Sequence, residues 1–188
     1  IIDIKRRNNI RRNHSVTHLL HKALKEVLGS HVNQAGSEVL PNRMRFDFSH
    51  FEAISESDLR KIESRVNEMI FESLPVETII TNPKDAYKLG AVGLFEEKYG
   101  QEVRVVKMGD YSMELCGGTH VSNTSEISMF KILSEGGVSS GVRRIESITG
   151  PAVYTHLNEL EELRNKASKI VKTNKVELIS KLKSIVED

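Results

Sequence analysis

Apolar residues in the first part of the chain recur at every third or fourth position, the period of an amphipathic helix. The segment HSVTHLLHKALKEVLG has this period; it follows Asn13, a residue type suited to an N-cap, and ends on Gly29, a common C-cap. A second helix is predicted after Ser55, because SESD has the form of a capping box and an apolar stripe follows it. Pro83 favours a short third helix in PKDAYKLG.

Short segments with strand character lie between and after these helices. Alternation in MRFDF, beside the turn at Pro41 and Asn42, predicts a hairpin over 31–50, and VETIIT predicts a further strand. Glycine turns separate four more such segments, EVRVVKMG, YSMELCGG, EISMFKILSEGG and GVRRIESITG. Together these elements predict an α+β fold, with a mainly antiparallel sheet flanked by helices.

The last part of the chain, 151–188, is highly charged and has apolar residues near heptad spacing. These residues are Leu157, Leu160, Leu163 and Ile170. The spacing predicts one long C-terminal helix that starts a coiled coil, through which two copies of the chain could pair as a dimer.

The composition is that of a water-soluble domain, with 38% hydrophobic and 28% charged residues. No apolar run approaches the roughly 20 residues that a membrane-spanning helix needs, and the amino terminus has no signal-peptide pattern. We therefore expect a cytoplasmic protein with no membrane partner. A single cysteine, Cys116, excludes an internal disulfide and leaves its thiol available for a metal or for chemistry.

The net charge of +1 conceals two clusters of positive charge. Lys5, Arg6, Arg7, Arg11 and Arg12 lie near the amino terminus, and Arg143 and Arg144 are adjacent. Both clusters suit contacts with nucleic-acid phosphates, and we expect Arg11, Arg12, Arg143 and Arg144 to contact RNA. Arginines on a strand can equally form ordinary surface ion pairs.

Four residues with metal-binding side chains form two short motifs. His14 and His18 are four residues apart on the first predicted helix, so both imidazoles leave the same face. Cys116 and His120 have the same spacing around two glycines, which allow a tight bend. A lone cysteine is often a small apolar residue, and His18 could pair with His21 instead. Considered jointly, the two motifs predict one Zn²⁺ site made of three histidines and one cysteine.

Several motifs resemble the editing domain of alanyl-tRNA synthetase. The motifs are RNHSVTHLLHKAL, GSEVLPNRMRFDFSHFEAI, LFEEKYGQEVRVVKMGDYSMELCGGTHVSNTSEI and GVRRIESITG, which fall within about residues 10–150. The resemblance implies hydrolysis of mischarged Ser-tRNA(Ala) and Gly-tRNA(Ala), with zinc held by His14, His18, Cys116 and His120. It also implies that 1–12 lead in from a preceding tRNA-binding domain, that 13–150 form the editing domain and that 151–188 form the C-terminal helix.

Ester hydrolysis requires a nucleophilic water, a polarised carbonyl and a selective pocket. Zinc can supply the first two, although four protein ligands are also typical of a closed structural site. The amides of Gly117 and Gly118 are candidates for holding the developing oxyanion, or the two glycines only relieve crowding. Thr17, Gln34 and Ser37 are candidates for recognising the seryl hydroxyl, although polar residues near a turn are often ordinary turn residues.

The sequence has no P-loop and no room for a synthetase catalytic domain, so we expect the chain to edit without activating an amino acid with ATP. It is predicted to be a fragment of a longer ATP-binding alanine–tRNA ligase, with the acceptor end of tRNA(Ala) and the remaining parent domains as partners. A freestanding trans-editing deacylase and a non-catalytic, zinc-stabilised tRNA-binding module remain alternatives. A zinc peptidase is disfavoured, because the motif H-E-x-x-H is absent.

Overall fold

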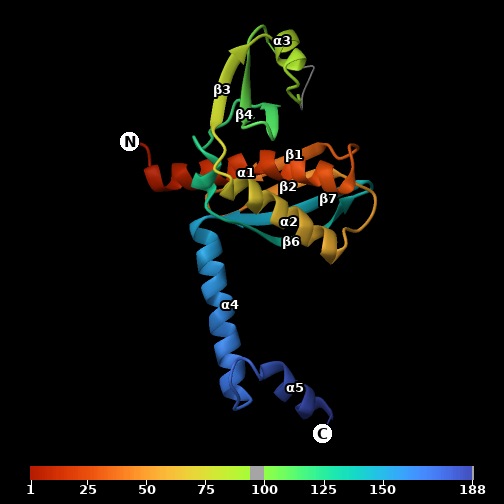
Figure 1. Cartoon of the computed structure of the whole chain (residues 1–188), viewed down its shortest axis with the longest axis vertical. Coiled ribbons are helices and arrows are strands. Elements are labelled where there is room, and N and C mark those ends of the chain that lie inside the picture. Colours follow the sequence, from red (N-terminus) through yellow and green to blue (C-terminus); the bar gives the residue numbers. More distant parts are fainter. Residues whose placement is uncertain (94–99, 188) are drawn as a thin grey trace. The chain divides into compact units, whose positions relative to one another are not determined.

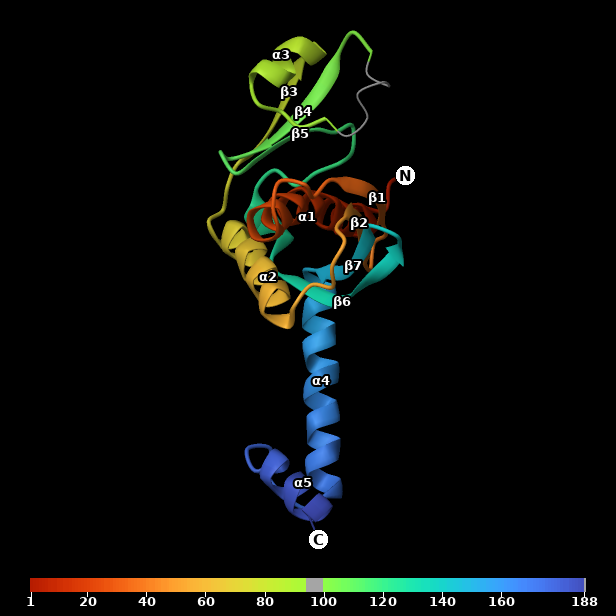
Figure 2. The same ribbon diagram turned by 90° about the vertical axis from the view of Figure 1, so that its right-hand side faces the viewer.

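The computed structural model describes residues 1–93 and 100–187, which divide into two units, 1–150 and 151–188. In the first unit, four antiparallel strands form a sheet in the order β1-β2-β7-β6. Their bounds are β1 Gln34–Val39, β2 Met44–Ser49, β6 Phe130–Ser139 and β7 Val142–Thr149. Helices α1 (Ile4–Leu28) and α2 (Glu56–Phe71) pack beside each other and against this sheet (Figures 1 and 2).

A second, three-stranded antiparallel sheet has the order β3-β4-β5. It consists of β3 Val76–Thr81, β4 Val103–Met108 and β5 Ser112–Leu115, and the short helix α3 (Pro83–Lys88) packs against β4. A 3-10 helix, η2 (Thr124–Ile127), links this part of the chain to β6. The α+β class and the antiparallel strands predicted from the sequence are therefore confirmed, as two sheets.

The main core lies between the two long helices and the four-stranded sheet. Met44, Phe46 and Phe48 alternate along β2 and are fully buried, while the residues between them are only half-buried. They meet Val16, Leu20 and Leu24 of α1, together with the apolar stripe of α2, in one cluster. Because α1 buries most of its residues between 13 and 24, the core fixes the direction of the helix face that carries its histidines.

The predicted start of the first helix is wrong. Helix α1 begins at Ile4, because the side chain of Asp3 accepts a hydrogen bond from the amide of Arg6 at 2.9 Å. Asn13 lies inside the helix and is buried, with its amide group donating to the Leu40 carbonyl at 2.7 Å. The predicted C-cap at Gly29 is confirmed, with its N–H donating to the Lys25 carbonyl.

The predicted strand EISMFKILSEGG also begins later than expected. Glu126 and Ile127 belong to η2, and the strand starts at Phe130. The side chain of Asn123 accepts a hydrogen bond from the amide of Ser125 and so caps this helical turn.

The second unit, 151–188, does not confirm one long helix. It contains α4 (Pro151–Ile170) and α5 (Leu178–Glu187). Lys172 has a φ of 53°, which ends the first helix, and the side chain of Asn174 then accepts hydrogen bonds from the amides of Val176 and Glu177. The coiled coil and the dimer stay predictions.

Candidate metal centre

His14 and His18 project from one face of α1 toward the loop that follows β5. His18 is buried and His14 is half-buried. Their ring centroids lie 5.9 Å apart, and each ring also approaches His120, at 4.4 Å and 4.8 Å respectively. The i, i+4 spacing on the helix therefore directs both imidazoles to one point.

The loop after β5 brings Cys116 and His120 to the same point. The amide of Cys116 donates to the Arg104 carbonyl at 2.9 Å, which fixes the start of the loop on β4. At Gly118 the backbone passes directly over the ring of His14, since a Cβ built there would lie 1.8 Å from His14 Cε1. Only glycine permits this approach of the loop to the helix.

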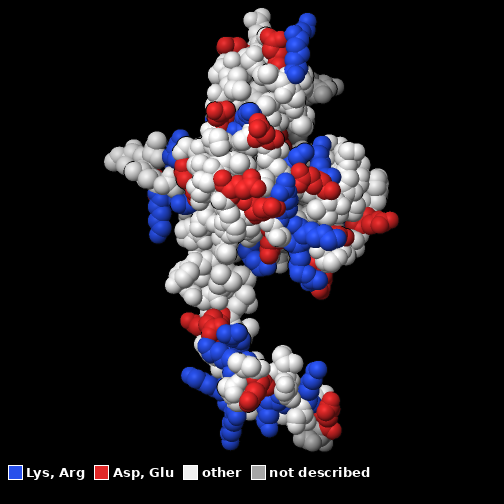
Figure 3. Space-filling model, viewed as in Figure 1, with Lys and Arg blue, Asp and Glu red and all other residues white. Residues whose placement is uncertain are grey.

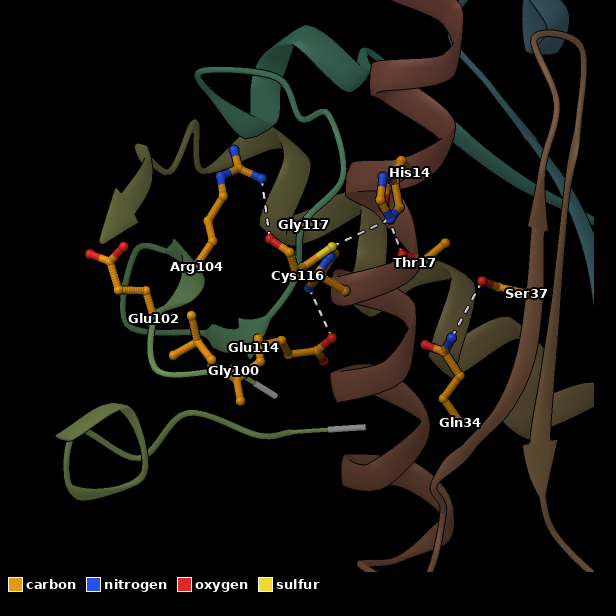
Figure 4. Close-up of a pocket in the computed structure, with 13 residues that line it drawn as sticks. His14, Thr17, Gln34, Ser37, Gly100, Glu102, Arg104, Glu114, Cys116 and Gly117 are labelled. Atoms are coloured by element: carbon orange, nitrogen blue, oxygen red, sulfur yellow. Dashed lines mark hydrogen bonds and ion pairs between the residues drawn. The ribbon is translucent and has the colours of Figure 1, made fainter. Parts of the chain in front are cut away.

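The four donor atoms lie close enough together for one metal ion to bind them. One ligand atom from each of His14, His18, Cys116 and His120 lies within 4.8 Å of the others. The Cys116 sulfur lies 3.5 Å from His14 Nε2 (Figure 4). It lies 3.3 Å from His120 Nε2. Tetrahedral zinc with bonds of about 2.0–2.3 Å separates its ligands by roughly 3.3–3.7 Å, so this donor set fits zinc.

Buried hydrogen-bonding partners orient the imidazoles. Glu114, on β5, places one carboxylate oxygen 2.9 Å from His18 Nδ1 and the other 2.9 Å from His21 Nδ1. The hydroxyl of Ser15 lies 3.2 Å from His120 Nδ1. A carboxylate or hydroxyl behind a histidine is the usual support of a metal ligand, because it fixes the ring and its tautomer.

The electrostatics of the cluster favour an ionised thiol. Burial alone would raise the pKa of Cys116, but hydrogen bonds from the surrounding histidines outweigh it and lower that pKa to about 3. Burial and the positive charge of the neighbouring histidines lower the pKa of His120 to about 4, although its hydrogen bond with Cys116 acts in the opposite direction. Cys116 is thus a thiolate and His120 a neutral imidazole, the forms in which these two residues bind zinc, whereas His18 would have to lose a proton to bind it.

The Glu114 carboxylate and His18 form a buried ion pair beside the donor cluster. Burial would disfavour charge on both groups, but their mutual attraction dominates; it raises the pKa of His18 and lowers that of Glu114. The carboxylate therefore stays ionised near neutral pH, where it forms an ion pair with His18 and a hydrogen-bond contact with His21.

A cavity of about 420 Å³ opens beside the donor cluster. Its lining includes His14, His18 and Cys116, together with Thr17, Gln34 and Ser37, the three residues predicted to contact a substrate, and Gly117. The Gln34 side-chain amide donates to the Ser37 hydroxyl at 3.3 Å, and the Thr17 hydroxyl donates to the His14 carbonyl at 2.6 Å (Figure 4). Three of the four candidate metal ligands and the substrate candidates therefore line the same cavity.

The four arginines predicted to contact RNA differ in their partners. Arg144 forms two hydrogen bonds of 2.7 Å with the Asp47 carboxylate, and Arg143 binds Glu135 in the same two-pronged way. Arg11 donates to the His120 carbonyl at 2.5 Å, and Arg12 donates to the Glu126 carbonyl at 2.8 Å. Carboxylates thus compensate the charge of Arg143 and Arg144, whereas these contacts of Arg11 and Arg12 are with uncharged backbone carbonyls.

Three residues around the site were not predicted from the sequence. Glu114 precedes Cys116 by two positions, so the strand period of two could have placed both on one face. Ser15 lies next to His14, and nothing in the sequence marks it as the partner of His120. Arg104 donates to the carbonyls of the metal-binding loop, a contact with no local sequence signal.

Part of the chain matches a family of domains that occur in aminoacyl-tRNA synthetases. Residues 103–146, from β4 into β7, match the family model described as the second additional domain of threonyl and alanyl tRNA synthetases. This match includes Cys116 and His120, whereas His14 and His18 lie before it.

Along its whole length, the chain is a relative of alanine–tRNA ligases. It is 56% identical over 188 residues to the alanine–tRNA ligase of Clostridioides difficile, with 100% of this chain and 21% of the relative covered. It is 55% identical over 184 residues to that of Thermoanaerobacter sp. (strain X514), where the coverage is 98% and 21%. The resemblance is therefore confirmed: the chain spans about a fifth of the length of these ligases and corresponds to one segment of them.

None of the helices in the described part of the chain is long and apolar enough to cross a membrane.

Proposed function

We propose that this chain hydrolyses Ser-tRNA(Ala) and Gly-tRNA(Ala), as the editing segment of an alanine–tRNA ligase. The observation that carries the proposal is a cluster of four metal-binding side chains, three of which, His14, His18 and Cys116, line a cavity that Thr17, Gln34 and Ser37 also line. The similarity over the whole chain to alanine–tRNA ligases supports it independently. A cavity of about 420 Å³ is within the size range of small-ligand sites, so it suits an aminoacyl group and its ribose.

Zinc bound by His14, His18, Cys116 and His120 would polarise the ester carbonyl and make a water molecule a better nucleophile near neutral pH. The chain's own groups hold the substrate. The Thr17 hydroxyl donates its proton to the His14 carbonyl of the same helix. Its oxygen can therefore accept a hydrogen bond from a substrate hydroxyl or ammonium group. Ser37 accepts from Gln34, which leaves the Ser37 proton to donate. A seryl side chain can therefore be recognised by polar partners that an alanyl side chain does not satisfy.

Gly117 lines the cavity beside Cys116, and its amide is the better placed of the two oxyanion candidates. Gly118 has a different role in this proposal, because the approach of its backbone to His14 already requires the absence of a side chain. Donors held by a fixed backbone stabilise a developing charge without reorganisation, and the loop is fixed at Cys116 and at His120.

A non-catalytic, zinc-stabilised tRNA-binding module is the second candidate. Four protein donors fill a tetrahedral shell, as in structural zinc sites. A freestanding deacylase would use the same residues as the editing segment. We assign ATP-dependent activation of alanine, and most of the binding contacts with tRNA(Ala), to other parts of a cytoplasmic parent enzyme. This assignment is supported by the length of the relatives, which are about five times longer than this chain.

The test is deacylation of Ser-tRNA(Ala), Gly-tRNA(Ala) and Ala-tRNA(Ala) by the purified, zinc-loaded chain without ATP. We expect loss of the seryl and glycyl esters at high enzyme concentration, with Ala-tRNA(Ala) spared. Affinity should be weak, because remote contacts with the tRNA body contribute to the chemical step. His14→Ala should abolish the activity, and His156→Ala, in the second unit, is the matched control.

Intact Ser-tRNA(Ala) at every enzyme concentration, with zinc bound and RNA binding retained, would favour the non-catalytic module. Equal hydrolysis of the seryl and alanyl esters would contradict the selectivity assigned to Thr17, Gln34 and Ser37. ATP-dependent alanylation by this chain would contradict the separation of editing from charging.

A further inference from the structure

Arg104 contacts the metal-binding loop through both its backbone and its side chain. Its carbonyl accepts from the Cys116 amide at 2.9 Å, and its guanidinium Nη1 donates to the Cys116 carbonyl at 3.2 Å and to the Gly118 carbonyl. Figure 4 shows its side chain beside the turn that carries Cys116 and Gly117. One residue of β4 therefore holds three backbone groups of the segment between two metal ligands.

The other end of the guanidinium is anchored in the neighbouring strand. Its Nη2 donates to the Thr78 hydroxyl of β3 at 3.1 Å. Because Thr78 and Arg104 belong to two paired strands of one sheet, the guanidinium is fixed to a rigid element before it reaches the loop. A planar group with several donors in a fixed arrangement can make these contacts together.

The loop has little tolerance for movement at this point. The Gly118 backbone lies so close to His14 that a Cβ there would be 2.3 Å from Nδ1 of the ring. A shift of the loop toward α1 is blocked by the ring, and a shift away breaks the bonds with Arg104. On the far side of the loop, Arg11 holds the His120 carbonyl at 2.5 Å.

We propose that Arg104 is a positioning residue for metal binding, which holds the loop 116–118 so that the Cys116 thiolate faces His14 and His120. The inference rests on the proposed zinc site and goes beyond it, because Arg104 is not a ligand and acts through the loop. Arg104 thereby differs in role from Arg143 and Arg144, whose guanidiniums form ion pairs with carboxylates on neighbouring strands. Loss of a residue that orients metal ligands typically lowers metal affinity by about 10- to 100-fold.

The experiment measures zinc affinity by competition with a chelator, and the visible absorption of the Co²⁺-loaded chain, for the wild type, Arg104→Ala and Arg104→Lys. Lys107→Ala is the matched control, since Lys107 lies on the same strand and, within 1–93 and 100–187, forms an ion pair with the exposed Asp110 alone. We expect about 10- to 100-fold weaker zinc binding and an altered Co²⁺ spectrum in Arg104→Ala, and no change in the control. The zinc affinity of Arg104→Lys should lie between those of the wild type and Arg104→Ala, because a single ammonium group cannot reproduce all the hydrogen bonds of the planar guanidinium.

Wild-type zinc affinity and an unchanged Co²⁺ spectrum in Arg104→Ala would overturn the inference and leave the zinc site intact. Slower deacylation with both metal measurements unchanged would also overturn it, because Arg104 would then contact the substrate directly. If Arg104→Ala does not fold, Arg104→Lys decides by the same two measurements. Failure of the wild type to bind zinc or cobalt would instead overturn the metal site itself, a result that needs no variant.

Discussion

The two neighbouring glycines of the metal-binding loop have different surroundings. A Cβ at Gly118 would overlap the ring of His14, whereas a Cβ at Gly117 would have no atom of the described residues within 4 Å outside its immediate neighbours. The sequence alone treats the two residues alike. Their difference lies in the packing of the loop on a helix about 100 positions earlier, which no local pattern reports.

Gly118→Ala should therefore impair metal binding, because the added carbon must displace either the loop or the His14 ring. We expect a loss of zinc affinity of at least about tenfold, the scale of losing ligand orientation. Calorimetric titration with zinc measures it. Gly117→Ala is the matched control and should bind zinc as the wild type does; equal losses in both variants would contradict the steric argument.

Glu114 supports two buried histidines with one carboxylate. Glu114→Gln keeps the shape of the side chain but replaces one acceptor oxygen by a donor, so His18 or His21 loses its partner. We expect zinc affinity to fall about 10- to 100-fold, measured by chelator competition. Glu77→Gln, at an exposed position of β3, is the control; an unchanged affinity in Glu114→Gln would show that His18 needs no carboxylate.

At the scale of elements, periodicity predicted most of the helices and strands, while several ends were wrong. The C-cap at Gly29 and the N-cap at Ser55 are local, since each cap acts within its own turn. The start of α1 was missed because Asn13 is a good N-cap in isolation, and only its buried contacts with Leu40 and Thr149 keep it inside a helix. The break after α4 depends on the positive φ of Lys172, and heptad spacing of apolar residues does not predict a positive φ.

Asn13→Ala is expected to destabilise the chain more than Asp3→Ala. Asn13 is buried, and it satisfies the Leu40 carbonyl and accepts from the Thr149 hydroxyl at 2.6 Å. Leaving such groups unpaired costs about 1–3 kcal/mol each, whereas loss of an exposed cap costs about 0.5–1 kcal/mol. Urea unfolding of both variants gives the comparison; a larger loss in Asp3→Ala would mean that the first turns of α1 contribute more than its buried part.

At the scale of the whole molecule, positive and negative side chains are interspersed over the visible face rather than separated (Figure 3). Near the amino terminus, three positive residues follow one another, and Lys5, Arg6 and Arg7 are all exposed. Arg143 and Arg144, in contrast, are each matched by a carboxylate on a neighbouring strand. The sequence predicted both clusters as RNA contacts, and only the paired strands distinguish them.

RNA binding should therefore depend more on the amino-terminal cluster than on the strand arginines. Replacing Lys5, Arg6 and Arg7 by Gln should lower the slope of log affinity for tRNA(Ala) against log salt concentration by about 0.7–0.9 for each phosphate that is no longer neutralised. The control replaces Arg144 by Gln together with Asp47→Asn, which preserves net charge and should leave the slope unchanged. Filter binding across a salt series measures both, and the opposite ranking would contradict this view.

The metal ligands come from two stretches of chain that are far apart in sequence, since the sulfur of Cys116 meets a histidine 102 positions earlier. A bound ion would thus act as a cross-link that closes a loop of about 100 residues. In the chain-entropy model, closing a loop of that length removes about 4–5 kcal/mol of freedom from the unfolded state. The same separation means that a ribosome must release the whole segment through His120 before the site can close, so His14 and His18 lack these two partners during most of the synthesis of residues 1–150.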